Sequence, residues 1–203
     1  MRQAIRSAVL CGLIVIMMTG CSRSPRVAYY SLESAARPEA GHIAHKELPV
    51  VSVETPTLPE LVDRPQLVER LSANRIEILE LHRWAEPLKS SVSRMLADNL
   101  SRLLESDRVS AYPQNAGSAA AYRVYVDFQR FESEGTAVSV DALWTIRRTA
   151  DGEQKTGRVR IHEPTGGEGY EAVIAAYNRA LAAVSSDIAQ VLRMEWGASL
   201  VRK

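Results

Sequence analysis

Residues 58–104 read LPELVDRPQLVERLSANRIEILELHRWAEPLKSSVSRMLADNLSRLL, and this stretch decides the fold. Two proline-containing junctions divide it, DRPQ at residues 63–66 and WAEP at residues 84–87. Apolar and polar residues alternate between the junctions, which is typical of strands, and apolar residues recur at helical spacing after the second junction. The stretch therefore predicts short strands, with a turn at Asn74, followed by an amphipathic helix.

The predicted helix begins near Pro87, because a proline in the first helical turn removes no helical hydrogen bond. Its stripe repeats every three or four residues, a spacing that turns one helical face toward a core. The stripe comprises Leu88, Val92, Met95, Leu96, Asn99, Leu100, Leu103 and Leu104. Such a stripe indicates core packing rather than a cofactor site.

The chain outside this stretch adds strands and a second helix. Alternation predicts strands at residues 48–55, 109–113, 122–128, 137–148 and 154–162, and Asp151-Gly152 predicts a hairpin turn. A second apolar stripe predicts a long helix at residues 170–196. The fold class that follows is α+β: a two-layer domain with a mainly antiparallel sheet and two long amphipathic helices on one face.

The composition is that of an ordinary globular protein. A length of 203 residues is typical of one domain with tails. Hydrophobic residues make up 46% and charged residues 24%, a balance that favours a folded core over disorder. The net charge of +1 argues against a protein that binds nucleic acid or a membrane through bulk positive charge.

The two cysteines, Cys11 and Cys21, both lie close to the N-terminus. The rest of the chain has none, which excludes a disulfide framework, a cysteine metal site and a cysteine nucleophile from the body of the protein.

The N-terminus has the features of a bacterial lipoprotein signal peptide. Two arginines precede an apolar run at residues 8–18, which is too short for an ordinary transmembrane helix. Met18-Thr19-Gly20-Cys21 then resembles a lipobox, which predicts cleavage after Gly20 and lipidation of Cys21. The alternative is ordinary signal-peptidase cleavage, which leaves a free thiol at Cys21.

A lipidated Cys21 attaches the protein stably to a membrane, because each buried CH₂ of an acyl chain contributes about 0.8 kcal/mol. Ser22 follows it, rather than the Asp associated with retention in the inner membrane. The sorting pattern of bacterial lipoproteins then predicts the outer membrane of a Gram-negative cell, on the periplasmic face. The predicted division of the chain is a signal peptide at 1–20, a lipidated N-terminus and tether at 21–46 with a short strand or docking segment at 29–32, a domain at 47–196 and a flexible tail at 197–203.

No catalytic motif emerges from the sequence. It contains neither GxSxG nor HExxH, and its serines lack the context of a nucleophile elbow. His82 and His162, each at the end of a predicted strand, are the candidates for a general base, although a histidine at a surface or interface is the favoured interpretation. We therefore predict no enzyme, no metal site and no cofactor other than the covalent lipid on Cys21.

Several short motifs appear in a recognisable order along the mature chain. After the lipobox come Tyr30-Ser31-Leu32, a predicted strand, the run from Leu58 to Val68 that contains DRPQ, and Arg83-Trp84-Ala85-Glu86-Pro87-Leu88 with its helix. In order and spacing they resemble the ABC-type transport auxiliary lipoprotein family, the PqiC-like or YmbA-like proteins. The resemblance covers nearly the whole mature chain.

The resemblance implies a non-enzymatic role in lipid transport between the two membranes of the cell envelope. The implied partners are an MCE-domain protein and the components of an inner-membrane transporter. The lipoprotein would dock at, or form, the outer-membrane end of the conduit and so support envelope integrity. Direct contact with phospholipid and a homo-oligomer both suit this role, and the sequence decides neither.

The two junctions supply the candidate partner interface, which comprises Asp63, Arg64, Gln66, Arg83, Trp84 and Glu86. Tryptophan and arginine are enriched in binding hot spots, which favours an interface. The structural interpretation is that Asp63 caps a turn, that the arginines pair with Glu60, Asp63 or Glu86, and that Trp84 packs beneath the first helix.

Two other functions remain open from sequence alone. A lipoprotein of this size is also compatible with an activator or regulator of a periplasmic envelope enzyme, for instance in cell-wall synthesis. The third alternative is a periplasmic hydrolase whose site has no familiar motif.

Overall fold

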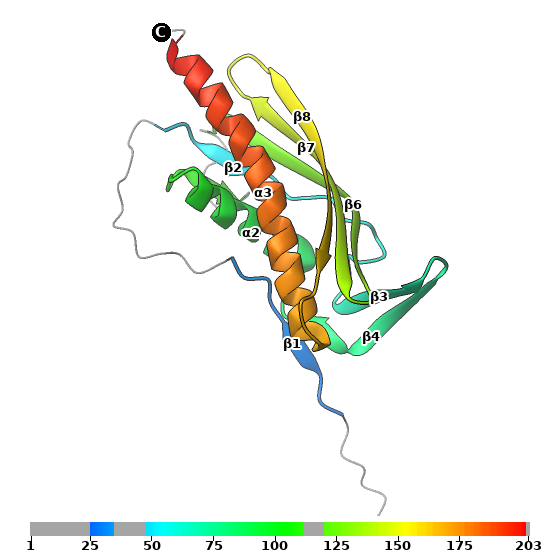
Figure 1. The fold of residues 1–203 in the computed structure, drawn as a ribbon. Helices are drawn as coiled ribbons and strands as arrows, with labels where there is room; N and C mark the ends of the chain where they lie inside the picture. The colour runs from blue at the N-terminus through cyan, green and yellow to red at the C-terminus, as the bar shows by residue number, and fades with distance from the viewer. Residues whose placement is uncertain (1–24, 35–47, 112–119, 202–203) are drawn as a thin grey trace, which may run out of the picture.

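The computed structural model describes residues 25–34, 48–111 and 120–201. These residues form a two-layer domain in which two helices cover one face of a mixed, eight-stranded sheet (Figure 1). The predicted α+β class is therefore confirmed. The predicted signal peptide and Cys21 lie outside the described residues.

The elements follow the predicted order along the chain. The strands are β1 (Ala28–Tyr30), β2 (Val51–Val53), β3 (Gln66–Ser72), β4 (Arg75–Trp84), β5 (Val109–Ala111), β6 (Tyr122–Glu134), β7 (Ala137–Arg148) and β8 (Gln154–Pro164). The helices are α2 (Leu88–Leu103) and α3 (Gly169–Val201).

Strand β6 is the centre of the sheet. One of its edges pairs with β7, which pairs in turn with β8, and this antiparallel meander was predicted from the alternation. Its other edge pairs in parallel with β2 at the N-terminal end and with β3 at the C-terminal end. The sheet is thus antiparallel in its longest pairings, and short parallel pairings join the remaining strands.

The meander buries the face that the alternation indicated. Val138, Val140, Ala142, Trp144 and Ile146 of β7 all lie in the core beneath the helices. Strand β6 continues past its predicted end at Phe128, and an irregularity in the pairing falls between Phe128 and Arg130. The extra residue shifts the phase of the strand, so that Phe131 returns to the core and the simple alternation is lost.

Strands β3 and β4 form the hairpin expected around Asn74, and the structure shows which of its apolar residues face the core. Leu79 is buried opposite Leu67, whereas Ile76 and Ile78 lie on the other face and are exposed. An irregularity next to Gln66 separates this part of the hairpin from Arg83 and Trp84. This change of phase explains why the alternation alone did not say which leucines and isoleucines face the core.

Both ends of the folded unit differ from the predicted boundaries. Strand β1 pairs in parallel with β4, and Leu32 is buried, so the fold includes residues on the N-terminal side of residue 47. Helix α3 continues through Gly197 to Val201, where a flexible tail was expected. Within the described ranges, no helix is long and apolar enough to cross a membrane.

Trp144 joins the meander to helix α3. Its indole Nε1 donates a hydrogen bond to Asp187 Oδ2 at 2.7 Å, and its ring lies directly over Gly157 of β8. A Cβ atom at residue 157 would lie only 2.2 Å from Trp144 Cζ2. The strand therefore needs a glycine at this position, and the reason is space rather than backbone conformation.

We predict that Gly157→Ala lowers the free energy of unfolding by about 3 kcal/mol, because the tryptophan must leave its rotamer or the strands must separate. Urea denaturation of the purified protein measures the change. Gly197→Ala is the matched control: no atom lies within 4 Å of a Cβ at that helical position, so its stability is unchanged or slightly higher. Equal stability of the two variants would contradict the packing of Trp144 over Gly157.

Candidate partner interface

The motifs that carry the family resemblance meet at one corner of the molecule. Trp84 N–H donates to the Pro65 carbonyl at 2.7 Å, and Ala85 N–H donates to the Tyr30 carbonyl at 2.8 Å. We call this region, residues 30–32, 63–66 and 83–88, the motif corner. Segments far apart in the sequence are thus joined by backbone hydrogen bonds at the point where β4 leads into helix α2.

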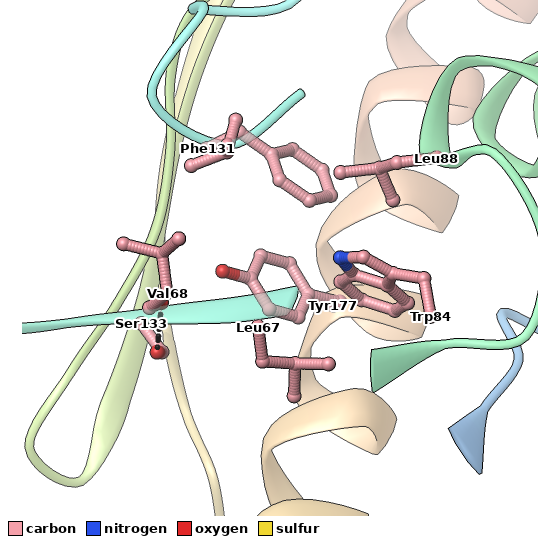
Figure 2. Close-up of a pocket in the computed structure, with 8 residues that line it drawn as sticks. Leu67, Val68, Trp84, Leu88, Phe131, Ser133 and Tyr177 are labelled. Atoms are coloured by element: carbon pink, nitrogen blue, oxygen red, sulfur yellow. Dashed lines mark hydrogen bonds between the residues drawn. The ribbon is translucent and has the colours of Figure 1, made fainter. Parts of the chain in front are cut away.

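Trp84 lies in the core beneath this corner, with only 7% of its surface exposed. Its ring meets Tyr177 of helix α3 edge to face, with 6.0 Å between centroids, and Tyr177 stacks on Phe131 at 4.4 Å. Figure 2 shows these rings together with Leu67 and Leu88. Trp84 is therefore not on a surface that a partner can reach, and the structural interpretation applies to it.

A small cavity of about 10 Å³ lies among these side chains, close to the size of one water molecule. Its lining residues are Val62, Leu67, Val68, Trp84, Leu88, Phe131, Ser133 and Tyr177. Burial raises the pKa of the Tyr177 phenol above its usual value, with a smaller opposing effect from a hydrogen bond to Ser133. Space of this size holds no acyl chain.

The charged residues of the corner are paired within the chain, although with other partners than expected. Asp63 Oδ2 lies 2.6 Å from Lys89 Nζ in the first turn of α2, which ties the DRPQ turn to the helix. Arg83 pairs with Glu80 at 3.5 Å, and Glu80 also accepts a hydrogen bond from Gln66.

Glu86 pairs with Arg94 one further turn along the helix, and the hydrogen bond from this guanidinium lowers the pKa of the Glu86 carboxyl. Arg64 differs from the others, because its Nε atom is buried without a hydrogen-bond partner among the described residues. The side chains of Arg64 and Glu86 remain partly exposed. Together with Asp63, Gln66 and Arg83, they form the part of the candidate interface that a partner can reach.

Sequence reasoning missed an aromatic cluster beside the corner. The Tyr30 hydroxyl lies 2.8 Å from His82 Nδ1, and the His82 ring lies 4.0 Å from the ring of Tyr170 at the start of α3. Burial, followed by the charge of Glu171, raises the pKa of Tyr30. His82 thus holds β1 against the sheet. His82 and Tyr170 are 88 positions apart in the sequence, so no local pattern indicated the contact.

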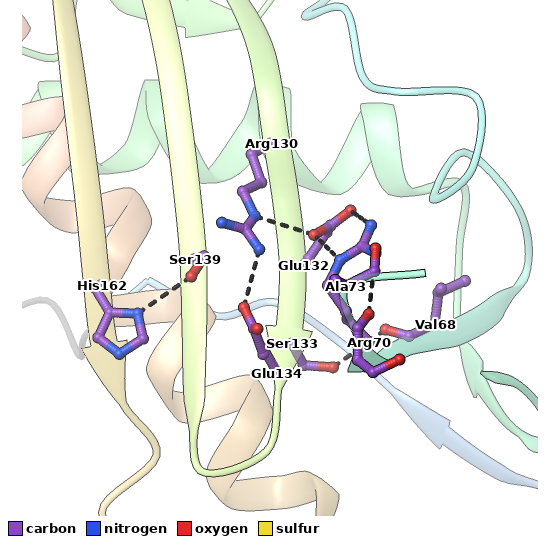
Figure 3. Close-up of polar contacts among 10 residues, drawn as sticks. Val68, Arg70, Ala73, Arg130, Glu132, Ser133, Glu134, Ser139 and His162 are labelled. Carbon is purple, nitrogen blue, oxygen red and sulfur yellow. Dashed lines mark hydrogen bonds and ion pairs between the residues drawn. The ribbon is translucent and has the colours of Figure 1, made fainter. Parts of the chain in front are cut away.

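The opposite face of the sheet is polar and open. Glu132 accepts hydrogen bonds from Arg70 and Arg130, and Arg130 also pairs with Glu134 at 2.9 Å (Figure 3). Hydrogen bonding to Arg70 lowers the pKa of the Glu132 carboxyl despite its partial burial. An open depression of about 600 Å³ lies over this network, and its polar groups already have partners within the chain.

His162 and Ser139 form a second polar pair on this face, with 3.2 Å between Nδ1 and Oγ (Figure 3). They lie opposite one another on β8 and β7, so the contact is a cross-strand pair of the kind that stabilises sheets. Among the described residues, no group of three or more His, Cys, Asp and Glu side chains is arranged to hold a metal ion.

We predict that Trp84→Ala lowers the free energy of unfolding by about 4 kcal/mol, because it removes a buried ring from the contact with Tyr177. Asp63→Ala, which removes a half-exposed ion pair, costs less than about 1 kcal/mol. Urea denaturation compares both with Trp84→Phe, which retains a ring and most of the stability. A Trp84→Ala protein as stable as Asp63→Ala would overturn the core role of Trp84.

Comparison with known proteins identifies a matching family and solved structures with a similar fold. The model of the ABC-type transport auxiliary lipoprotein component family matches residues 30–189. A search of curated proteins finds no match. Among solved structures, an uncharacterized protein superposes with a TM-score of 0.68 at 20% identity, covering 83% of this chain and 99% of its own. Protein XCC0632 from Xanthomonas campestris superposes with a TM-score of 0.62 at 18% identity, covering 87% of this chain and 99% of its own.

At these identities the two structures show the fold alone. The family match spans every strand from the end of β1 onward, helix α2 and most of α3, and it includes the whole motif corner. On this match, the chain belongs to the ABC-type transport auxiliary lipoprotein component family.

Proposed function

We propose that the protein is a non-enzymatic outer-membrane lipoprotein of an MCE/ABC-type intermembrane lipid transport system. Held on the periplasmic face by lipid on Cys21, it docks at or forms the outer-membrane end of the conduit and supports envelope integrity. The observation that carries this proposal is the family match over residues 30–189, which makes the chain an auxiliary component of a transporter.

The structure is compatible with a docking part rather than a lipid carrier. The enclosed cavity beneath the motif corner is about 10 Å³, and the large depression on the sheet is open and lined by ion pairs. A pocket that buries a drug-sized ligand is commonly 300–1,000 Å³ and mostly apolar. Among the described residues, contact with partner proteins is therefore the favoured use of the surface.

Anchoring through Cys21 predicts that Cys21→Ser abolishes incorporation of labelled palmitate and releases the protein from the outer-membrane fraction. The expected loss of label is complete, because the palmitate is attached through Cys21. Metabolic labelling and membrane fractionation in a Gram-negative host measure both effects. Ser22→Ala is the control, which keeps the lipidated cysteine. Palmitate that remains on the Cys21→Ser protein would contradict the proposed anchor.

If the protein docks through the motif corner, the double variant Arg64→Ala with Arg83→Ala weakens co-purification with an MCE-domain protein about tenfold or more. The midpoint of its thermal unfolding is unchanged. An arginine at the centre of a protein interface commonly contributes 2 kcal/mol or more to binding. Cross-linking in cells, followed by mass spectrometry, identifies and quantifies the partner.

Arg147→Ala on the exposed face of β7 is the matched control for loss of an arginine far from the corner. Retained binding of the MCE-domain protein by the double variant would exclude the corner as the docking surface. Capture of an envelope enzyme in place of any MCE-domain protein would instead favour a regulatory lipoprotein.

A further inference from the structure

The β3–β4 hairpin extends beyond the rest of the sheet. Strand β3 pairs with β6 only at Glu69 and Arg70, and β1 pairs with β4 only from His82 onward. Beyond Arg70, the end of the hairpin at residues 71–75 has no third strand beside it among the described residues. Residues 76–81 of β4 pair with β3 on one edge, and their other edge has no strand beside it before His82. Figure 1 shows the hairpin leading away from the two helices.

This hairpin carries an unusual amount of exposed apolar surface. Leu71 is 42% exposed, Ile76 and Ile78 are each 37% exposed, and Leu81 is 38% exposed. A two-stranded ribbon gains little stability from side chains left in water, and exposed apolar groups gathered on one element mark an interaction surface. We call residues 70–78 the hairpin tip.

The charges of the hairpin tip favour an anionic surface. The segment from Arg70 to Ile76, RLSANRI, contains two arginines and no acidic residue. Arg70 is bound to Glu132, which leaves the exposed Arg75 at the end of the hairpin. Glu77 follows on the same face of the strand as Arg75, and Ile76 and Ile78 lie together on the other face.

The N-terminal segment emerges at the same end of the molecule. Strand β1 lies beside the C-terminal part of β4, near the start of α3, where the hairpin also departs (Figure 1). Val27 and Tyr29 are exposed there, Tyr29 to 64% of its surface. Residues 21–30, CSRSPRVAYY, again contain two arginines and no acidic residue.

The short N-terminal segment limits how far the hairpin tip can lie from the membrane that holds Cys21. Six residues lie between Cys21 and Ala28, so seven residue steps place the lipidated cysteine at most about 25 Å from β1, whatever path the chain takes. Ala28 is paired with His82, and the strand from His82 to Arg75 is about 23 Å long. A bilayer that holds Cys21 is therefore within reach of the hairpin tip.

We propose that the hairpin tip inserts into the headgroup region of the bilayer that holds the lipid of Cys21. Leu71, Ile76 and Ile78 enter the boundary with the acyl chains, and Arg75 contacts anionic headgroups. Tyr29 lies at the interface on the neighbouring segment. The inference rests on the proposed anchor at Cys21, and it adds a second attachment point that fixes the orientation of the domain on the membrane.

The test uses the full-length lipoprotein made in a Gram-negative host, in which lipidation blocks the Cys21 thiol. Asn74→Cys supplies a single thiol for an environment-sensitive fluorophore at the tip, and Ala150→Cys supplies one in the exposed turn before β8. Both proteins are reconstituted into vesicles of phosphatidylethanolamine and phosphatidylglycerol that contain a spin-labelled lipid. We expect a blue shift and strong quenching at residue 74, and neither at residue 150.

Matched variants separate the apolar contact from a general effect of surface polarity. Ile76→Ser with Ile78→Ser is expected to reduce the quenching at residue 74 to the level seen at residue 150. Tyr125→Ser with Leu143→Ser changes side chains that are 40% and 38% exposed on the outer face of the sheet, and is expected to leave the quenching unchanged.

The outcomes distinguish the tip from the anchor. Protein that floats with the vesicles but shows equal quenching at both positions would overturn insertion of the tip and leave the anchor intact. Protein that does not float would overturn the anchor and, with it, the argument from chain length. A fluorescence shift that follows protein density in the vesicle and ignores the spin label would assign the tip to a contact between copies, which also overturns the proposal.

Discussion

The contact of Trp84 with Tyr177 is the interaction on which the rest of the structure depends. It joins the end of β4 to the first third of α3, and the stacking of Tyr177 on Phe131 continues the contact into β6. The hairpin, the long helix and the central strand are distant in sequence, so local preferences alone do not place them. Once this stack forms, helix α2 must start at the motif corner, since Trp84 and Leu88 enter the same core.

Sequence patterns predicted the parts of the fold in which neighbouring residues carry the information. Strand β7 was predicted with its observed bounds, because its alternation is uninterrupted from Ala137 to Arg148. The irregularity after Phe128 hid the second half of β6, since one extra residue reverses the faces of a strand. The parallel pairing of β1 with β4 joins residues more than 50 positions apart, and nothing in a short window of sequence encodes it.

The candidate interface shows a related limit. Trp84 was selected because tryptophan is common in binding hot spots, but large aromatic rings also dominate cores, and the residue type does not separate the two. The structure brings the charged candidates together at the corner, but their ion-pair partners differ from the predicted ones. Lys89 reaches Asp63 only because the start of α2 lies over the DRPQ turn, a position set by the buried stack rather than by sequence spacing.

The direction of β1 has a mechanical consequence. The strand runs parallel to β4, and its hydrogen bonds lie beside the buried Trp84 and the Tyr30–His82 contact. A pull on the N-terminus along the strand loads these bonds together, in shear, instead of opening them one after another. Tension at that end is therefore carried into the aromatic core, and the contacts of β1 with β4 resist it together.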